Sequence, residues 1–267
     1  MLNRLNKIDL LSFINEIKKI AKDAGNILMH IYHSGFESSI EYKADNSPVT
    51  IADKTASDYI VSALQILNPE IPVLSEESII PSYDERKKWK NFWLIDPLDG
   101  TKEFIKKNGE FTVNIALIIN KKPVLGVVYA PDNDLMFWAV RGMGAYQIID
   151  GKDQKMFSNP VDPERKGLKI VLSRSHLDKA TLDFLKNYND PVVINRGSSI
   201  KFMEIASGSA HIFFRFNEVK EWDTAASHII LKESGADMKN ILTGKNIFYN
   251  KKDMKIPGFL VLNQKIR

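Results

Sequence analysis

The spacing of apolar residues changes along this chain, and the change limits the folds that it can adopt. Apolar side chains recur at three- and four-residue steps from about residue 10 to 31, and again from about Ile51 to Leu67. That spacing predicts two long amphipathic helices, the second ended by Asn68-Pro69. Between them lie a short strand-like piece at 40–42 and a polar turn at 44–48.

The middle of the chain has the composition of β-strands. The apolar run 92–95 is expected to be a strand that ends at Asp96-Pro97. Segments 111–120, 123–130 and 135–140 are rich in β-branched and aromatic residues and are separated by polar turns. They predict an antiparallel meander, with another turn at Gly142 and Gly144.

From about residue 168, short expected strands alternate with expected helices, which predicts an α/β layer. The strands are expected at 169–172, 192–194, 211–214 and 259–262, and the helices at 177–188, 199–207 and 224–234. The polar loop 158–166 is the best candidate boundary. We therefore divide the chain into an α+β half, residues 1–160, and an α/β half, residues 161–267.

Composition excludes several classes of protein. The chain has no cysteine, which excludes cysteine nucleophiles, thiolate metal sites and disulfides. A net charge of +4, with scattered lysines, argues against binding of duplex nucleic acid but allows a basic pocket for a small anion. The apolar runs are shorter than the ~20 residues that span a bilayer, and Asp9 and Glu16 interrupt any secretory signal. The sequence also lacks the P-loop, GxSxG and HExxH patterns, which argues against kinases, NTPases, serine hydrolases and zinc proteases.

The segment 93–104 is the most informative stretch for chemistry. Asp96 and Asp99 are three residues apart, and Pro97 restricts the backbone between them. The two carboxylates and the Leu98 carbonyl are hard oxygen ligands, which suit Mg²⁺ better than Zn²⁺. Gly100 and Thr101 would place backbone N–H groups at a helix start, where phosphate binds well. The alternative is that both aspartates are ordinary turn and cap residues.

Other polar residues are candidate partners for this segment. Glu76-Glu77 follows a short apolar run, Asp53 lies in the first turn of the second helix, and Asp223 lies at the start of the helix near 224. Each alone is explained by a helix cap or a solvated loop, but strand ends and helix starts are where α/β proteins gather ligands. The cationic and hydroxyl residues that suggest a phosphate site, with caps and surface residues as the alternative, are His176, Ser198, Lys201 and Arg215.

Four motifs in order resemble those of the inositol monophosphatase superfamily of Mg²⁺-dependent, lithium-sensitive phosphomonoesterases. In chain order they are Val49–Asp53, Ser75–Ser78, Asp96–Thr101 and Trp222–Ala226, and the last two are the family's signature motifs. Lys102-Glu103 stands where an inositol monophosphatase usually has Thr-Asn, which favours the bisphosphate nucleotidase branch. The stretches similar to that branch are 43–50, 99–106, 108–117 and 197–202.

The resemblance covers nearly the whole chain and implies a layered α/β/α/β/α sugar-phosphatase sandwich that holds two to three Mg²⁺ ions. Glu76, Asp96 and the Leu98 carbonyl would bind the first ion, and Asp96, Asp99 and Asp223 the second. A third would lie near Glu76. Thr101 and Asp53 would position and activate the attacking water, assisted by Glu76.

The implied reaction is hydrolysis of 3′-phosphoadenosine 5′-phosphate to AMP and phosphate. The substrate-contact positions are expected at Glu76, Leu98, Asp99, Gly100, Thr101, Asp223, Ser198, Lys201, Arg215 and His176. The alternatives are hydrolysis of inositol phosphate or fructose 1,6-bisphosphate and, in another class, a non-catalytic nucleotide-binding module. The resemblance implies a cytoplasmic enzyme and leaves open a homodimer and loose contact with the inner face of the cell membrane.

Overall fold

The computed structural model describes residues 7–34, 41–42, 48–175 and 178–264. Most of the polar turn expected at 44–48 lies outside these residues. The helices are α1 (Lys7–His33), α2 (Ile51–Leu67), α3 (Tyr83–Arg86), α4 (Thr101–Ile105), α5 (Lys179–Leu185), α6 (Ile200–Ala206) and α7 (Trp222–Ser234), with a 3₁₀ turn at Pro131–Asn133.

The strands form two large sheets and two small ribbons. The first large sheet has the order β3-β4-β5-β6-β7-β8-β9 and the second has β10-β17-β13-β11-β12, with β15 also paired to β17; β1 pairs with β2, and β14 with β16. The strand bounds are β1 Glu41–Tyr42, β2 Pro48–Val49, β3 Val73–Ser75, β4 Asn91–Asp99, β5 Thr112–Ile119, β6 Lys122–Ala130, β7 Leu135–Val140, β8 Gly144–Ile149, β9 Lys152–Met156, β10 Pro160–Val161, β11 Lys169–Ser173, β12 Val192–Arg196, β13 Ile212–Arg215, β14 Val219–Lys220, β15 Asp237–Asn240, β16 Lys255–Ile256 and β17 Phe259–Gln264.

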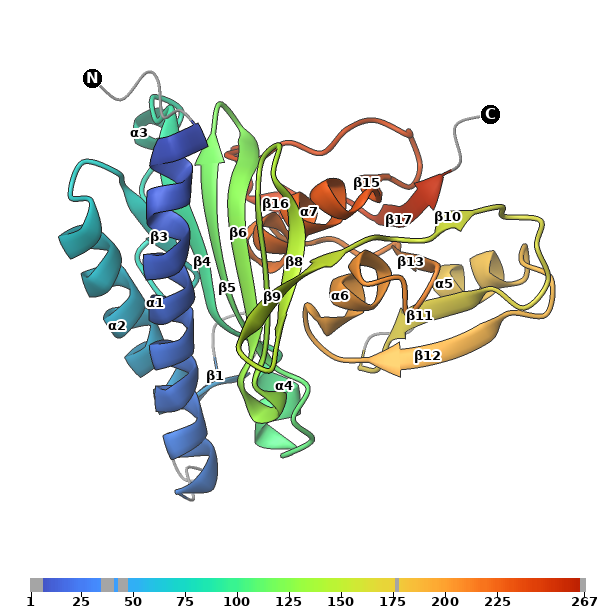
Figure 1. Ribbon diagram of the computed structural model, residues 1–267, viewed down its shortest axis with the longest axis horizontal. Helices are drawn as coiled ribbons and strands as arrows, with labels where there is room; N and C mark the ends of the chain where they lie inside the picture. Colours follow the sequence, from blue (N-terminus) through green and yellow to red (C-terminus); the bar gives the residue numbers. More distant parts are fainter. Residues whose placement is uncertain (1–6, 35–40, 43–47, 176–177, 265–267) are drawn as a thin grey trace.

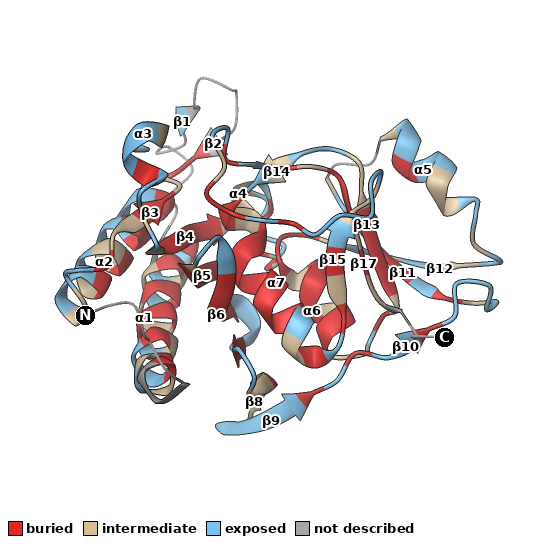
Figure 2. Cartoon of the chain, turned by 90° about the horizontal axis from the view of Figure 1, so that it is seen from above, coloured by how far each residue is buried: buried red, intermediate tan, exposed pale blue. Residues whose placement is uncertain are grey.

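The elements stack in five layers. Helices α1 and α2 cover one face of the first sheet, α6 and α7 lie between the two sheets, and α5 packs on the outer face of the second (Figure 1). Because α6 and α7 lie between the two sheets, they are buried over most of their length (Figure 2). The expected α/β class is confirmed, and the layers follow the order α/β/α/β/α.

Alternation of side chains along β4 and β5 explains why the first sheet can be covered on both faces. Trp93 and Ile95 point toward α1 and α2, whereas Phe92 and Leu94 join the core around α7. The contact with α7 is close because Gly126 on β6 has no side chain. A Cβ there would lie 2.6 Å from the carbonyl oxygen of Ala226. This close packing holds the first turns of α7 directly against the sheet.

Helix α2 begins and ends where the sequence predicts. Thr50 accepts a hydrogen bond from the Ala52 N–H at 3.1 Å, and Asp53 accepts one from the Thr50 N–H at 2.7 Å. These bonds satisfy N–H groups that a helix start leaves unpaired. The cap reading of Asp53 is therefore correct, and it also fixes the direction of the carboxylate.

We expected strand β4 to end at Asp96, but in the structure it continues to Asp99. Asp96 pairs with Asn114 and Asp99 pairs with Thr112, so three steps on β4 oppose two on β5. The extra residue is a β-bulge, and a bulge tolerates Pro97 because it needs no ladder N–H there. In a regular strand, positions three apart face opposite sides; the bulge restores Asp96 and Asp99 to the same face.

The expected meander at 111–140 is confirmed as β5, β6 and β7, and it continues into β8 and β9, which we did not predict. The expected strands and helices after residue 168 are also confirmed within a few residues, although the start of α5 was placed at Leu177, outside the described residues. The ribbon β14–β16 and strands β10 and β15 were missed. The division near residue 160 stays a prediction.

Candidate active site

Three carboxylates from distant parts of the chain meet at one point. Glu76 follows β3, Asp96 lies on β4, and Asp223 is in the first turn of α7. One ligand oxygen of each lies within 4.8 Å of the others. The parallel pairing of β3 with β4 and the packing of α7 on the sheet bring them together.

The charges of this cluster are not compensated by its own members. Burial, followed by the nearby charge of Glu76, raises the pKa of Asp96 well above its usual range. Burial also raises the pKa of Asp223, and Asp99 and Glu76 add to that shift. Close carboxylates therefore destabilise one another, and a cation among them would relieve the repulsion.

Asp99 stands beside this cluster with a different set of contacts. Its Oδ2 accepts a hydrogen bond from the Ser199 hydroxyl at 2.7 Å and faces the Asn114 amide nitrogen at 3.5 Å. Burial raises its pKa, although the positive charge of Lys201 opposes the shift. Asp96 is oriented by the Leu98 N–H, which donates to Asp96 Oδ1 at 3.2 Å.

Thr101 and Asp53 form a pair across the end of the sheet. The Thr101 hydroxyl lies 3.0 Å from Asp53 Oδ1 and 3.3 Å from the Leu98 carbonyl oxygen. Asp53 Oδ2 is held by the hydroxyl and the N–H of Thr50, at 2.8 and 2.7 Å. Burial raises the pKa of Asp53 to about 6, which is closer to neutrality, as proton transfer requires.

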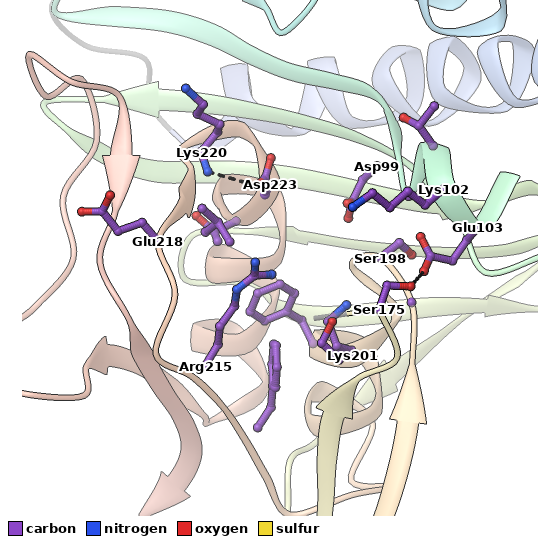
Figure 3. Close-up of a pocket in the computed structure, with 18 of the residues that line it drawn as sticks. Asp99, Lys102, Glu103, Ser175, Ser198, Lys201, Arg215, Glu218, Lys220 and Asp223 are labelled. Atoms are coloured by element: carbon purple, nitrogen blue, oxygen red, sulfur yellow. Dashed lines mark hydrogen bonds between the residues drawn. The ribbon is translucent and has the colours of Figure 1, made fainter. Parts of the chain in front are cut away.

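A cavity of about 460 Å³ opens beside these residues. Figure 3 shows Asp99 and Asp223 on one side of it and Lys201 and Arg215 on another. The lining includes the sequence-predicted residues Glu76, Asp99, Gly100, Thr101, Ser198, Lys201, Arg215 and Asp223. Residues from both halves of the sequence therefore share one cavity, while His176 lies outside the described residues.

The cationic side of the cavity contains the buried Lys201 and the half-buried Arg215, and loss of hydration is unfavourable for both charges. Lys201 is 7% exposed, and burial lowers the pKa of its ammonium group to about 8. Burial also lowers the pKa of Arg215, whose Nε has no hydrogen-bond partner among the described residues. Removing a cation from water is costly, and an anion in the cavity would offset that cost.

The turn that carries Ser198 is pressed against the turn that carries Gly100. A Cβ on Gly100, whose φ is +98°, would lie 2.9 Å from the Glu110 carbonyl oxygen and 3.1 Å from Ser198 Cβ. Ser198 itself has a φ of 42°, in the left-handed region. Glycine is therefore needed at position 100 for both conformation and close approach.

Sequence reasoning missed the contacts that fix the cavity walls. Glu110 accepts two hydrogen bonds from Arg174, both at 2.8 Å, and one from the Gly197 N–H at 2.7 Å. Ser175 donates to Glu103 Oε1 at 2.6 Å. We noted Glu103 and Glu110 only as parts of the longer stretches 93–106 and 108–117. Their partners are at least 64 positions away, so local patterns do not reveal these contacts.

The carboxylate cluster fits a hard divalent cation. Its donors are oxygen atoms of Glu76, Asp96 and Asp223, the ligand type that Mg²⁺ prefers. The raised pKa values of Asp96 and Asp223 show that a positive charge is what this arrangement needs. The site can therefore bind a metal ion.

The fold and this site define a class of phosphatase. The family model described as the inositol monophosphatase family matches residues 9–265, and the chain belongs to that family. Within it, the chain is 40% identical over 249 residues to the 3′(2′),5′-bisphosphate nucleotidase CysQ of Escherichia coli, covering 93% of this chain and 98% of the relative. It is 34% identical over 221 residues to the CysQ of Haemophilus influenzae, covering 83% of this chain and 81% of the relative.

Solved structures agree with these sequence matches. The crystal structure of CysQ from Bacteroides thetaiotaomicron superposes with a TM-score of 0.81 and 37% identity, covering 94% of this chain and 98% of that one. The Thermotoga maritima IMPase, at 23% identity, has a TM-score of 0.79 over 94% of this chain and 92% of its own, and shows the shared fold. Within the described residues, no helix has the length and apolarity to cross a membrane.

Proposed function

We propose that this chain is a Mg²⁺-dependent phosphomonoesterase that hydrolyses 3′-phosphoadenosine 5′-phosphate to AMP and phosphate. The observation that carries the proposal is one cavity with carboxylates on one side and two cations, the buried Lys201 and the half-buried Arg215, on another. A bisphosphate matches this arrangement, because one phosphate needs metal ions and the second needs protein cations. The names of the relatives, bisphosphate nucleotidases, support the same substrate.

We assign the metal ligands as the resemblance implies. Glu76, Asp96 and the Leu98 carbonyl would hold one Mg²⁺, and Asp96, Asp99 and Asp223 a second, with a third near Glu76. When bound, Mg²⁺ neutralises phosphate charge and lowers the pKa of bound water. The carboxylates would position the ions, and their mutual repulsion favours metal binding.

The proton of the attacking water would pass through Thr101 to Asp53. The Thr101 hydroxyl donates to Asp53 Oδ1 at 3.0 Å, so its oxygen is free to accept a hydrogen bond from water and hold it for attack. Thr50 anchors the other oxygen of Asp53, which keeps the carboxylate aimed at Thr101. Glu76 assists from the metal side.

The 5′-phosphate would bind Lys201, Arg215 and Ser198, with His176 as a further candidate. Lys201 and Arg215 lose part of their hydration in the folded protein, and a phosphate dianion would compensate both positive charges. The cytoplasmic location, the contact with a membrane surface and the homodimer stay predictions.

Phosphate release from a panel of substrates tests the proposal. With Mg²⁺, the protein should hydrolyse 3′-phosphoadenosine 5′-phosphate faster than inositol 1-phosphate or fructose 1,6-bisphosphate, and Li⁺ should inhibit the reaction. Faster release from either competitor would replace the substrate assignment. Nucleotide binding without any Mg²⁺-dependent release would identify a non-catalytic binding module instead.

A further inference from the structure

A buried serine lies between two of the proposed metal ligands. Ser199, directly before α6, has no exposed surface. Its Oγ is 2.7 Å from Asp99 Oδ2 and 3.3 Å from the backbone carbonyl oxygen of Asp223. Ser199 therefore contacts both the end of β4 and the start of α7, whereas the sequence indicated only a hydroxyl at a helix start, with a helix cap as the ordinary explanation.

The direction of each hydrogen bond in this cluster follows from what each group can donate. An ionised carboxylate only accepts, so the single hydrogen of the Ser199 hydroxyl goes to Asp99, the nearer and charged acceptor. The Ser199 oxygen must then accept from another group, and the Asn114 amide nitrogen lies 2.9 Å away. The Ser199 hydroxyl therefore donates mainly to Asp99.

Asn114 is itself held in the orientation that this arrangement requires. The Thr112 hydroxyl donates to Asn114 Oδ1 at 3.1 Å, which turns the amide nitrogen toward Ser199 and Asp99. Thr112 and Asn114 are 0% and 1% exposed, so water does not compete for these bonds. The bulge in β4 places Asp96 and Asp99 opposite these same two residues.

We propose that Ser199, aligned by Asn114, is a positioning residue that orients the Asp99 carboxylate for the divalent cation. Among the described residues, the hydrogen bonds to Asp99 all use Oδ2, so Oδ1 is left for a metal ion. Without the Ser199 hydroxyl, the hydrogen bond left to Asp99 among the described residues is the 3.5 Å one from Asn114. This inference rests on the proposed function, because it assumes that Asp99 binds metal.

If Ser199 is a positioning residue, its replacement should lower the affinity for the metal ion while the protein still folds. Removing a hydrogen-bonding partner of a metal ligand typically weakens metal binding about 10- to 100-fold. Ser199→Ala should therefore bind Mn²⁺, used as a paramagnetic substitute for Mg²⁺, about 10- to 100-fold more weakly at one site. Mn²⁺ titration followed by electron paramagnetic resonance measures this without substrate or turnover.

Ser234→Ala is the matched control. Ser234 is also buried in the described structure, but its hydroxyl donates to the Leu231 carbonyl oxygen within α7 at 2.7 Å. It should bind Mn²⁺ as the wild type does. Asn114→Ala should weaken Mn²⁺ binding too, and the double variant Asn114→Ala/Ser199→Ala should be little weaker than Ser199→Ala alone, since both act on the same carboxylate.

Two results would overturn the inference. One is wild-type Mn²⁺ affinity in a folded Ser199→Ala variant; the other is a double variant whose losses simply add. If Ser199→Ala does not fold, wild-type affinity in Asn114→Ala overturns it instead. Mg²⁺-dependent phosphate release by the wild-type protein is scored separately, so the proposed function survives or fails independently of Ser199.

Discussion

Replacing Lys201 with methionine should stabilise the protein and weaken substrate binding. Lys201 is buried, and its pKa falls from 10.5 to about 8, mainly through burial and despite the favourable charge of Asp99. At roughly 1.4 kcal/mol per pKa unit, the charged side chain costs about 3 kcal/mol of stability. Methionine has a similar length and carries no charge, so the variant removes this cost.

The pH dependence of that cost has a definite sign. Between pH 8 and 10.5 the unfolded chain binds the lysine proton and the folded protein does not. Stability therefore rises with pH through this window, and the penalty is present in full only below it. Lys201→Met should be up to about 3 kcal/mol more stable than wild type at pH 7, and the difference should shrink toward pH 10.5.

Urea unfolding of the two proteins at both pH values measures this difference. Lys152→Met, at an exposed lysine on β9, is the control and should change stability by less than about 0.5 kcal/mol. The KM for 3′-phosphoadenosine 5′-phosphate should rise about 10- to 150-fold in Lys201→Met, because a charged hydrogen bond contributes about 1.5–3 kcal/mol. For 3′-AMP, which lacks the 5′-phosphate, KM should change little. A destabilised variant at pH 7, or equal KM changes for both substrates, would refute the reasoning.

The remaining predictions concern the carboxylate side. Asp96→Asn should lower kcat at least about 1,000-fold in a phosphate-release assay, since the metal supplies several kcal/mol of charge stabilisation; near-normal turnover would contradict the assignment. Thr101→Val should lower kcat about 100- to 10,000-fold with little change in KM, and a matching change in KM alone would argue for binding instead. Because the pKa of Asp53 rises from 3.8 to about 6, metal-free stability should fall as pH rises through that window. Asp53→Asn should flatten this slope in thermal melts with EDTA, and an unchanged slope would count against it.

Local signals in the sequence were sufficient for the long helices α1 and α2 and for strands β5 to β7 of the meander. Helix α2 was placed correctly because its apolar residues recur at helical spacing and Asn68-Pro69 ends it. The structure adds a local capping box of Thr50 and Asp53 at its start. The end of β4 was placed wrongly because Pro97 looked like a strand breaker. Only the pairing with β5 shows that the chain continues through a bulge.

The candidate site was accessible from sequence only in part. The acidic motifs lie in short segments of the sequence, and they occur in the same order as in the family that the chain resembles. The residues that support them depend on contacts between distant segments. Ser199 meets Asp99 across 100 positions, and Asn114 meets Ser199 across 85. One signal was present, since Asn114 is the polar residue within the apolar run 113–119, where a buried amide needs partners.

Anomalous diffraction from crystals grown with Mn²⁺ tests the central claim most directly. The account predicts a peak among the carboxylate oxygens of Glu76, Asp96 and Asp223, at coordination distances of about 2.0–2.3 Å, and its loss in Asp223→Asn. A wild-type crystal with these carboxylates ordered and no peak between them would contradict it.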